Sequence, residues 1–246
     1  MITKEELSEV KYKRKISLYY AEKEYLQYIF LNAISKQSDN FVFKGGTCLR
    51  ICYGLERASE DLDFSCNMKL AELGILVANC LKDFDLLAIP FEIYSKKEYQ
   101  GNIRFEIRFK GPLYSGNKNS TNTLKIDFNK QKVHTRSVRV VPQLFSDVPL
   151  FTLIALEEKE ILAEKIRALI NRKEPRDMYD LWMLSKKGAE IDKKLIKLKL
   201  SEERANLSDL MFPSKKDYEL GLKDLTLNLP TYDEVKRDLE VLFKGL

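Results

Sequence analysis

Apolar residues at intervals of three and four positions mark several helices. The segment 17–36 has this spacing and predicts a long amphipathic helix that ends before the polar stretch KQSDN. The segment 70–87 predicts another. From residue 152 onward only helical patterns follow, first in 152–171 and 175–188 and then in three lysine-rich amphipathic segments. The second half of the chain is therefore expected to be helical.

Alternation of apolar and polar residues predicts strands in the first half. The segment FVFK reads as a short buried strand that leads into a glycine turn and a helix start, and LDFSC reads as another strand. Four further segments alternate at period two: 91–97, 102–111, 123–129 and 137–142. These strands are expected to form one mixed sheet.

The change from strands to helices suggests two domains. An α/β (α+β) domain, a mixed sheet flanked by helices, is expected over residues 1–147, and a helical bundle over residues 148–246. The segment SDVPLF, with its serine, aspartate and proline, is typical of a short linker and a helix cap. We expect the joint between the domains there.

Composition narrows the classes of function. The chain has 246 residues, 44% of them hydrophobic, and a formal net charge of +5, which is compatible with a nucleotide or nucleic acid partner. The four cysteines form no CxxC pair, so free thiols in a reducing cytoplasm are expected. No apolar run approaches the roughly 20 residues of a membrane span. His134 is the only histidine, which argues against serine-triad and histidine-ligated metal chemistry.

Two aspartates one residue apart are the first candidates for chemistry. On a strand, Asp61 and Asp63 point to one face while Leu62 lies on the other. The segment LKIDF repeats this construction, and a neighbouring strand would bring Asp127 beside the pair. Three carboxylates suit Mg²⁺ or Mn²⁺ and a nucleotidyl transfer. The alternative is that the three aspartates merely occupy the solvent-facing positions of half-buried strands, and it stays open.

A glycine pair precedes these aspartates. Gly45 and Gly46 allow a close approach of the backbone, and the amides of the following helix suit a phosphate. Polar and basic side chains nearby could add hydrogen bonds or positive charge; they are Lys44, Thr47, Arg57 and Ser59. A tight turn with a capping threonine is the structural alternative.

The helical half offers two more candidates. Lys165 shares an apolar stripe with Leu162 and Leu169, so it needs an anionic partner, either a nearby carboxylate such as Glu158 or a triphosphate. Asp177 lies in the first turn of a helix, where the helix dipole favours it whatever the function. Six lysines of the tail could contact an RNA backbone or simply be solvated; they are Lys186, Lys187, Lys193, Lys194, Lys197 and Lys199.

Four blocks in order resemble the AbiEii/AbiGii family of nucleotidyltransferase toxins, which belongs to the polymerase-β-like superfamily and acts in abortive infection and type IV toxin–antitoxin systems. The blocks are KGGTCLRICYGLERASEDLDF, LKIDF, LEEKEILAEKIRAL and RKEPRDMYDLW. The resemblance implies a mixed sheet, a helical bundle and Mg²⁺-dependent transfer of NMP from an NTP. It also implies an RNA acceptor such as the tRNA 3′ end, and an antitoxin, often a DNA-binding repressor.

The resemblance also assigns roles. Gly45, Gly46 and Thr47 match the phosphate loop, although the wider superfamily has glycine–serine here and a shorter interval to Asp61. Asp61 and Asp63 match the metal pair and Asp127 the third carboxylate, which helps activate the attacking hydroxyl. Lys165 matches a lysine that contacts the nucleotide phosphates, and Asp177 the acidic residue of the last motif. Transfer to a protein or small molecule, or a non-catalytic role, are the alternatives.

Overall fold

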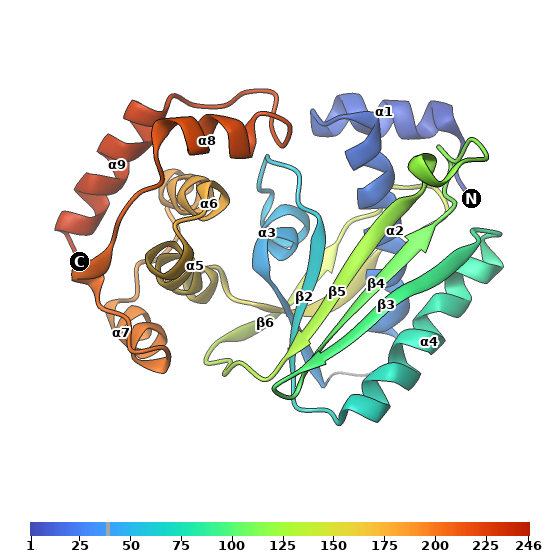
Figure 1. Cartoon of the computed structure of the whole chain (residues 1–246), viewed down its shortest axis with the longest axis horizontal. Helices are drawn as coiled ribbons and strands as arrows, with labels where there is room; N and C mark the ends of the chain where they lie inside the picture. Colours follow the sequence, from blue (N-terminus) through green and yellow to red (C-terminus); the bar gives the residue numbers. More distant parts are fainter. Residues whose placement is uncertain (38–39) are drawn as a thin grey trace. The chain divides into compact units, whose positions relative to one another are not determined.

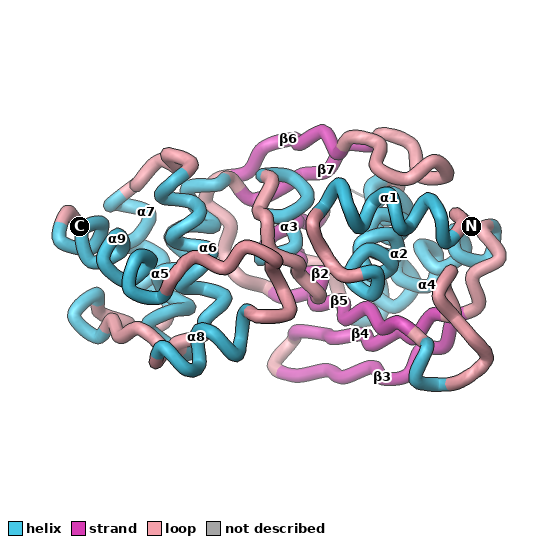
Figure 2. The backbone as a smooth tube through the Cα atoms, turned by 90° about the horizontal axis from the view of Figure 1, so that it is seen from above, coloured by secondary structure: helices cyan, strands magenta, loops and turns pink. Residues whose placement is uncertain are grey.

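A computed structural model describes residues 1–37 and 40–246, which form two compact units (Figures 1 and 2). The first runs from Met1 to Leu156 and contains the sheet, and the second runs from Glu157 to Leu246 and is helical. Ser38 and Asp39, in the predicted KQSDN stretch, lie outside the described residues. In the part of the chain that is described, no helix has the length and apolar character of a membrane span.

Across the described residues, seven strands form one mixed sheet in the order β3-β4-β5-β2-β1-β7-β6. Their bounds are β1 Phe41–Lys44, β2 Asp61–Cys66, β3 Phe91–Tyr99, β4 Asn102–Phe109, β5 Asn122–Asn129, β6 Arg136–Val141 and β7 Phe151–Leu156. The pairs β1/β7 and β2/β5 are parallel, and the other neighbours are antiparallel. The predicted mixed sheet is confirmed.

The helices of the first unit are α1 Lys4–Arg14, α2 Leu18–Ser35, α3 Gly45–Tyr53 and α4 Leu70–Leu86. α2 packs against α4, β5 and β7, and Figure 1 shows α2 and α4 behind the sheet. Phe84 of α4 contacts Phe109 of β4 with ring centroids 4.5 Å apart, and Phe64 stacks on Phe128 across β2 and β5 at 5.2 Å. One face of the sheet is thus apolar core, and the polar side chains lie on the other.

The second unit contains α5 Glu158–Arg172, α6 Pro175–Lys186, α7 Lys193–Glu202, α8 Lys215–Leu222 and α9 Tyr232–Lys244. α5 packs on α6 and α7, while α6 also contacts α8 and α9. Pro175 occupies the first turn of α6, where its missing N–H costs no hydrogen bond. These helices follow the predicted order of helical segments and build the expected bundle.

Two expectations were wrong in detail. Helix α1 precedes the helix that was expected to open the fold; Thr3 caps it by accepting from the backbone N–H of Glu6. The helix predicted from residue 152 begins at Glu158, because residues 151–156 form β7 between β1 and β6. A short apolar run does not distinguish a buried strand from a helix start. We propose that the α/β domain ends at Leu156 rather than in the segment 146–151.

Candidate functional site

The sheet brings the three predicted carboxylates onto one face. Asp61 and Asp63 alternate along β2 with Leu62, whose side chain is fully buried in the core. β5 runs parallel to β2, and the register sets Asp127 directly opposite Asp63. Side chains directly opposite each other in a sheet share a face and have Cβ atoms about 5 Å apart. Two distant segments of sequence therefore meet at the predicted position.

Asp127 has one satisfied oxygen and one that is not. Arg104 on β4 donates from Nε to Asp127 Oδ1 at 2.7 Å. Within the described residues, Asp127 Oδ2 is buried and has no hydrogen-bond partner. Burial raises the pKa of Asp127 above its usual value and the charge of Asp61 raises it further, although Arg104 opposes both. A buried oxygen without a donor fits a ligand that supplies positive charge.

The donor set fits a hard divalent cation that also binds a substrate. Among the described residues, no three His, Cys, Asp or Glu side chains are gathered into a ready-made metal centre. The aspartates therefore share a face of the sheet without forming a ready-made three-carboxylate metal centre among the described residues. Mg²⁺ commonly takes one or two carboxylates together with waters and substrate phosphates, so a partial set is the kind that it uses.

The glycine pair lies against this carboxylate face. Gly45 begins α3 with a φ of 77°, in the left-handed region, and a Cβ there would lie 2.4 Å from Asp63 Oδ2. A Cβ on Gly46 would lie 2.8 Å from Arg57 Nη2 and 3.0 Å from Ser59 Oγ. A side chain at either position would clash with these groups, so both positions require glycine. Lys44, the residue before α3, makes no side-chain hydrogen bond that caps the helix. The first-turn amides of α3 lie beside Asp63, where a phosphate would meet them.

Thr47 has a different place from the one expected. It is fully buried and donates its hydroxyl proton to the carbonyl oxygen of Asp61 at 2.5 Å, with Ser59 Oγ 2.9 Å away. Thr47 therefore holds β2 against α3, and a bond from it to phosphate would require this contact to break. Ser59 is half-buried, whereas Arg57 is buried and donates to the carbonyl oxygen of Ala58 at 2.8 Å. The hydroxyl of Ser59 is therefore better placed than that of Thr47 to donate to a phosphate.

Lys44 lies on the same polar face, directly opposite Asp63 in the antiparallel pairing of β1 with β2. Its side chain is buried, and its ammonium group contacts the Oε1 atom of Gln131. Sequence reasoning missed both Gln131 and Arg104. The alternation in NIRFEIRF puts Arg104 on the polar side of its strand, but only the strand order shows that this side faces Asp127.

Lys165 and Asp177 meet in the helical unit. Lys165 Nζ lies 2.8 Å from Asp177 Oδ1 and 2.7 Å from Asp180 Oδ2, and both carboxylates are fully buried. Arg172 Nε donates to Asp177 Oδ2 at 2.7 Å. Burial raises the pKa of Asp177, but Lys165 and Arg172 outweigh it and lower the pKa to about 2. A nearby carboxylate was expected to pair with Lys165, with Glu158 as the example; the two carboxylates found there are Asp177 and Asp180, and neither was assigned to Lys165 from the sequence.

The sequence matches a family model over residues 29–241, and the model is described as "Nucleotidyl transferase AbiEii toxin, Type IV TA system". This chain belongs to the AbiEii family. It is a nucleotidyltransferase toxin of a type IV toxin–antitoxin system, which confirms the resemblance drawn from the four sequence blocks.

Solved structures have the same fold as this AbiEii protein. MenT4, a nucleotidyltransferase toxin from Mycobacterium tuberculosis H37Rv, aligns with a TM-score of 0.76 and 20% identity over 100% of this chain and 91% of that one. JHP933 from Helicobacter pylori aligns with a TM-score of 0.63 and 23% identity over 93% and 92%. No curated protein sequence matches the chain.

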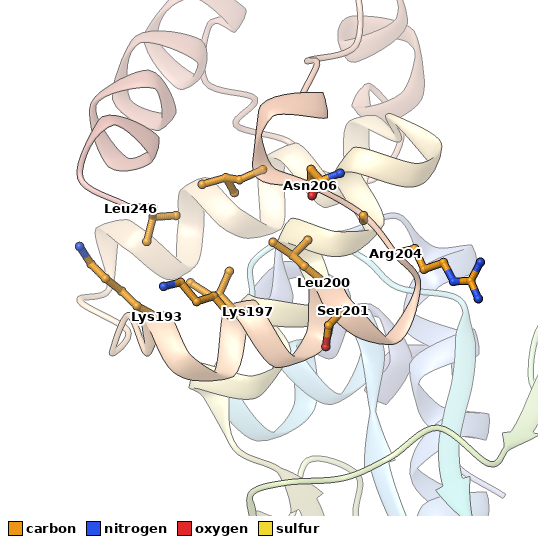
Figure 3. A pocket seen from close by; sticks show the side chains of 10 residues that line it. Lys193, Lys197, Leu200, Ser201, Arg204, Asn206 and Leu246 are labelled. Atoms are coloured by element: carbon orange, nitrogen blue, oxygen red, sulfur yellow. The ribbon is translucent and has the colours of Figure 1, made fainter.

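The lysine-rich tail of this AbiEii chain is only partly exposed. Lys199 is fully buried and pairs with Glu160 at 2.8 Å, while Lys186 pairs with Asp238 at 2.8 Å. Lys193 and Lys197 line a pocket of about 660 Å³ together with Leu200 and Leu246 (Figure 3). Lys199 is therefore part of the core of the helical unit and cannot contact RNA as expected. The solvated-face alternative explains the exposed members equally well.

Proposed function

We propose that this protein transfers NMP from a nucleoside triphosphate to the 3′ hydroxyl of an RNA, with Mg²⁺ or Mn²⁺, and that tRNA is the acceptor. The observation that carries the proposal is the position of Asp63 opposite Asp127, beside the glycine-led start of α3. Carboxylates for a cation and the first-turn amides of a helix, which suit a phosphate, adjoin each other there. That combination suits an attack on a nucleotide phosphate better than it suits a structural role.

The residues of the chain divide the work. Asp61, Asp63 and Asp127 would hold the divalent cation, which when bound neutralises charge on the phosphoryl oxygens. Asp127 accepts the proton as the RNA oxygen bonds to the α-phosphorus, and the bond to the bridging oxygen breaks and releases pyrophosphate. The α3 amides at Gly45 and Gly46, with Ser59 and Arg57, hold the phosphates. Lys44 lies opposite Asp63 and adds positive charge.

The helical unit contributes through two further residues. By the family resemblance, we assign Lys165 to the phosphates of the nucleotide and Asp177 to holding Lys165 in place. The contacts of 2.8 Å to Asp177 and 2.7 Å to Asp180 hold the ammonium in place. A fixed ammonium loses little side-chain entropy when an anion binds.

A type IV toxin implies a cognate antitoxin, which we propose to be a DNA-binding repressor. The reaction itself would take place in the cytoplasm, where nucleoside triphosphates and tRNA are available. Modification of the tRNA 3′ end would block translation and account for toxicity.

The test is to incubate the purified protein with total tRNA, Mg²⁺ and each α-labelled NTP in turn. We expect label to enter RNA with one or more NTPs. Asp63→Asn, which keeps the side-chain shape but removes the charge, should lower the rate about a thousandfold, because the loss of several kcal/mol of transition-state stabilisation has that effect. Asp85→Asn, an exposed position on α4, is the matched control and should react like the wild type.

Other outcomes would redirect the proposal. Label on a protein or a small molecule instead of RNA would show a different acceptor for the same machinery. Loss of activity in Asp85→Asn as well would point to damaged folding. Binding of NTP without any transfer, or equal activity of Asp63→Asn and wild type, would contradict the assignment of the carboxylates.

A further inference from the structure

The polar face that holds the aspartates continues across β4 and β3 to the edge of the sheet. Arg104 lies opposite Asp127 on one side and opposite Lys97 on the other, so these side chains form a row. The next rows along the strands are Lys125, Glu106 and Ser95, and then Thr123, Arg108 and Glu92. Lys97, Arg104 and Lys125 are exposed. The three rows carry four cations, Arg108 being the fourth, against three carboxylates, and these cations lie beside the proposed reaction centre.

Aromatic rings are interleaved with these cations. Tyr94, at a bulge in β3, has the guanidinium carbon of Arg108 3.4 Å from its ring centroid and is 54% exposed. Tyr99, opposite Asn102 near the end of the same strand, is 71% exposed. Rings that keep this exposure on the edge of a sheet bury little apolar surface of their own. They offer a flat surface on which a base can stack.

A pocket of about 430 Å³ lies where this face meets the connection between β4 and β5. Arg108, Lys110 and Lys118 supply its positive charge, Phe91 and Tyr114 line it with rings, and Glu92 is its acidic residue. Arg108 follows Arg104 by four residues, so the pocket begins about 14 Å along the strand from the Asp127 row. The pocket has the size of a small-ligand site and adjoins the polar face.

The wall of this pocket is held in place from the core. Buried Glu22 of α2 accepts from the backbone N–H of Leu113 at 2.7 Å and from Asn122 Nδ2 at 3.0 Å. A Cβ on Gly111 would lie 2.7 Å from the same carboxylate, so the connection approaches α2 as closely as glycine allows. A buried charge with such partners fixes the loop that carries Tyr114 and Lys118. The pocket is therefore preorganised.

Resting on the proposed function, we propose that this face and pocket bind the single-stranded 3′ end of the acceptor RNA. Tyr94 and the rings of the pocket stack on unpaired bases, while Lys97, Lys125 and Lys118 contact phosphates. We call this face together with the pocket the RNA track. The track runs from the pocket to Asp127, so it brings the terminal hydroxyl of the RNA to the carboxylates. Aromatic rings between cations favour a nucleic acid over an acidic protein, which has no bases to stack.

The test uses Tyr94→Ala/Lys118→Ala, which changes two positions outside the carboxylate site. A matched control is Tyr12→Ala/Lys11→Ala on α1, where Tyr12 is 75% exposed and a lysine lies 5.1 Å from its ring. Binding of a short fluorescein-labelled single-stranded RNA is followed by anisotropy at several salt concentrations. We expect the track variant to weaken RNA binding roughly tenfold and to lower the salt slope by about one, with the control unchanged.

Kinetics then separate this inference from the proposed function. With RNA transfer established, the track variant should raise KM for RNA and leave kcat and the affinity for NTP unchanged. Weaker RNA binding in the variant without any RNA labelling by the wild type would support the surface and contradict the RNA acceptor. Equal RNA affinity of variant and wild type, an equal loss in the control, or no RNA binding by the wild type would each overturn the track.

Discussion

The protein contains two clusters of aspartate that look alike in sequence and differ in surroundings. On the sheet, Asp61, Asp63 and Asp127 share one face, and Asp127 has a buried oxygen that finds no donor in the described part of the chain. In the helical unit, Asp177 and Asp180 are fully buried against Lys165, and Arg172 adds a second cation to Asp177. In the first cluster a buried carboxylate oxygen lacks a donor among the described residues, although Arg104, Lys44 and Lys125 lie opposite the aspartates, whereas in the second cluster cations contact both carboxylates.

This difference separates two uses of a carboxylate. A carboxylate oxygen that is buried without a donor is held in place by the fold at a cost, because burial removes water and neighbouring carboxylates repel it. A cation that binds beside this oxygen stabilises the cluster. A cluster in which each carboxylate contacts a cation stabilises the folded state by itself, because each charge meets its partner in a site with little water. The pKa of Asp127 is raised and that of Asp177 is lowered, in agreement with this contrast.

The largest expected effect on stability comes from Asp177→Ala in the helical unit. It removes one of the two buried carboxylates that the Lys165 ammonium contacts, which is also the carboxylate that Arg172 binds, and we expect the free energy of unfolding to fall by about 3–5 kcal/mol. Chemical denaturation followed by circular dichroism measures this loss. Asp233→Ala removes an exposed partner of Lys215 in the same unit and should cost less than about 1 kcal/mol. Equal losses in both variants would contradict a structural role for the buried pair.

The pH dependence of stability gives a smaller effect. The pKa of Asp177 is about 2 in the folded protein against an ordinary value of 3.8. Its contribution is therefore complete above about pH 4 and is lost as the pH falls through about 2. The shift corresponds to about 2 kcal/mol. Urea unfolding followed by the fluorescence of Trp182, the only tryptophan and a residue of α6, measures it. An equal loss in Asp177→Asn would assign it to other groups.

The smallest expected change in stability comes from Asp61→Asn. Removing this charge relieves repulsion with Asp127, so the free energy of unfolding should stay within about 0.5 kcal/mol of wild type. Nucleotidyl transfer should be lost nevertheless, because a cation ligand is gone. Parallel unfolding and transfer assays test both parts. A large loss of stability would show that Asp61 is structural and that the two clusters do not differ as described.

Periodicity alone predicted most helices and strands, because each buries one face and the period of that face is set by backbone geometry. It failed at β7, where FTLIAL is apolar except for Thr152 and the choice of strand depends on pairing with β1 and β6. It also missed α1, because that helix carries few apolar residues; Leu7 and Val10 are its buried positions. Local pattern is thus sufficient where an element is half-exposed and long, and insufficient where its partners decide its form.

The sequence by itself determined the family, the alternation that sets Asp61 and Asp63 on one face, and the glycines that allow a close approach. Only the tertiary structure decided what surrounds them. The parallel register of β2 and β5 put Asp127 opposite Asp63. The strand order put Arg104 on one oxygen of Asp127 and, over residues 1–37 and 40–246, left the other oxygen without a donor. It also turned Thr47 inward to Asp61 and paired Lys165 with Asp177 and Asp180. The spacing of residues along a strand determines the face to which each side chain points. The charged groups that surround that side chain come from residues that are distant in sequence.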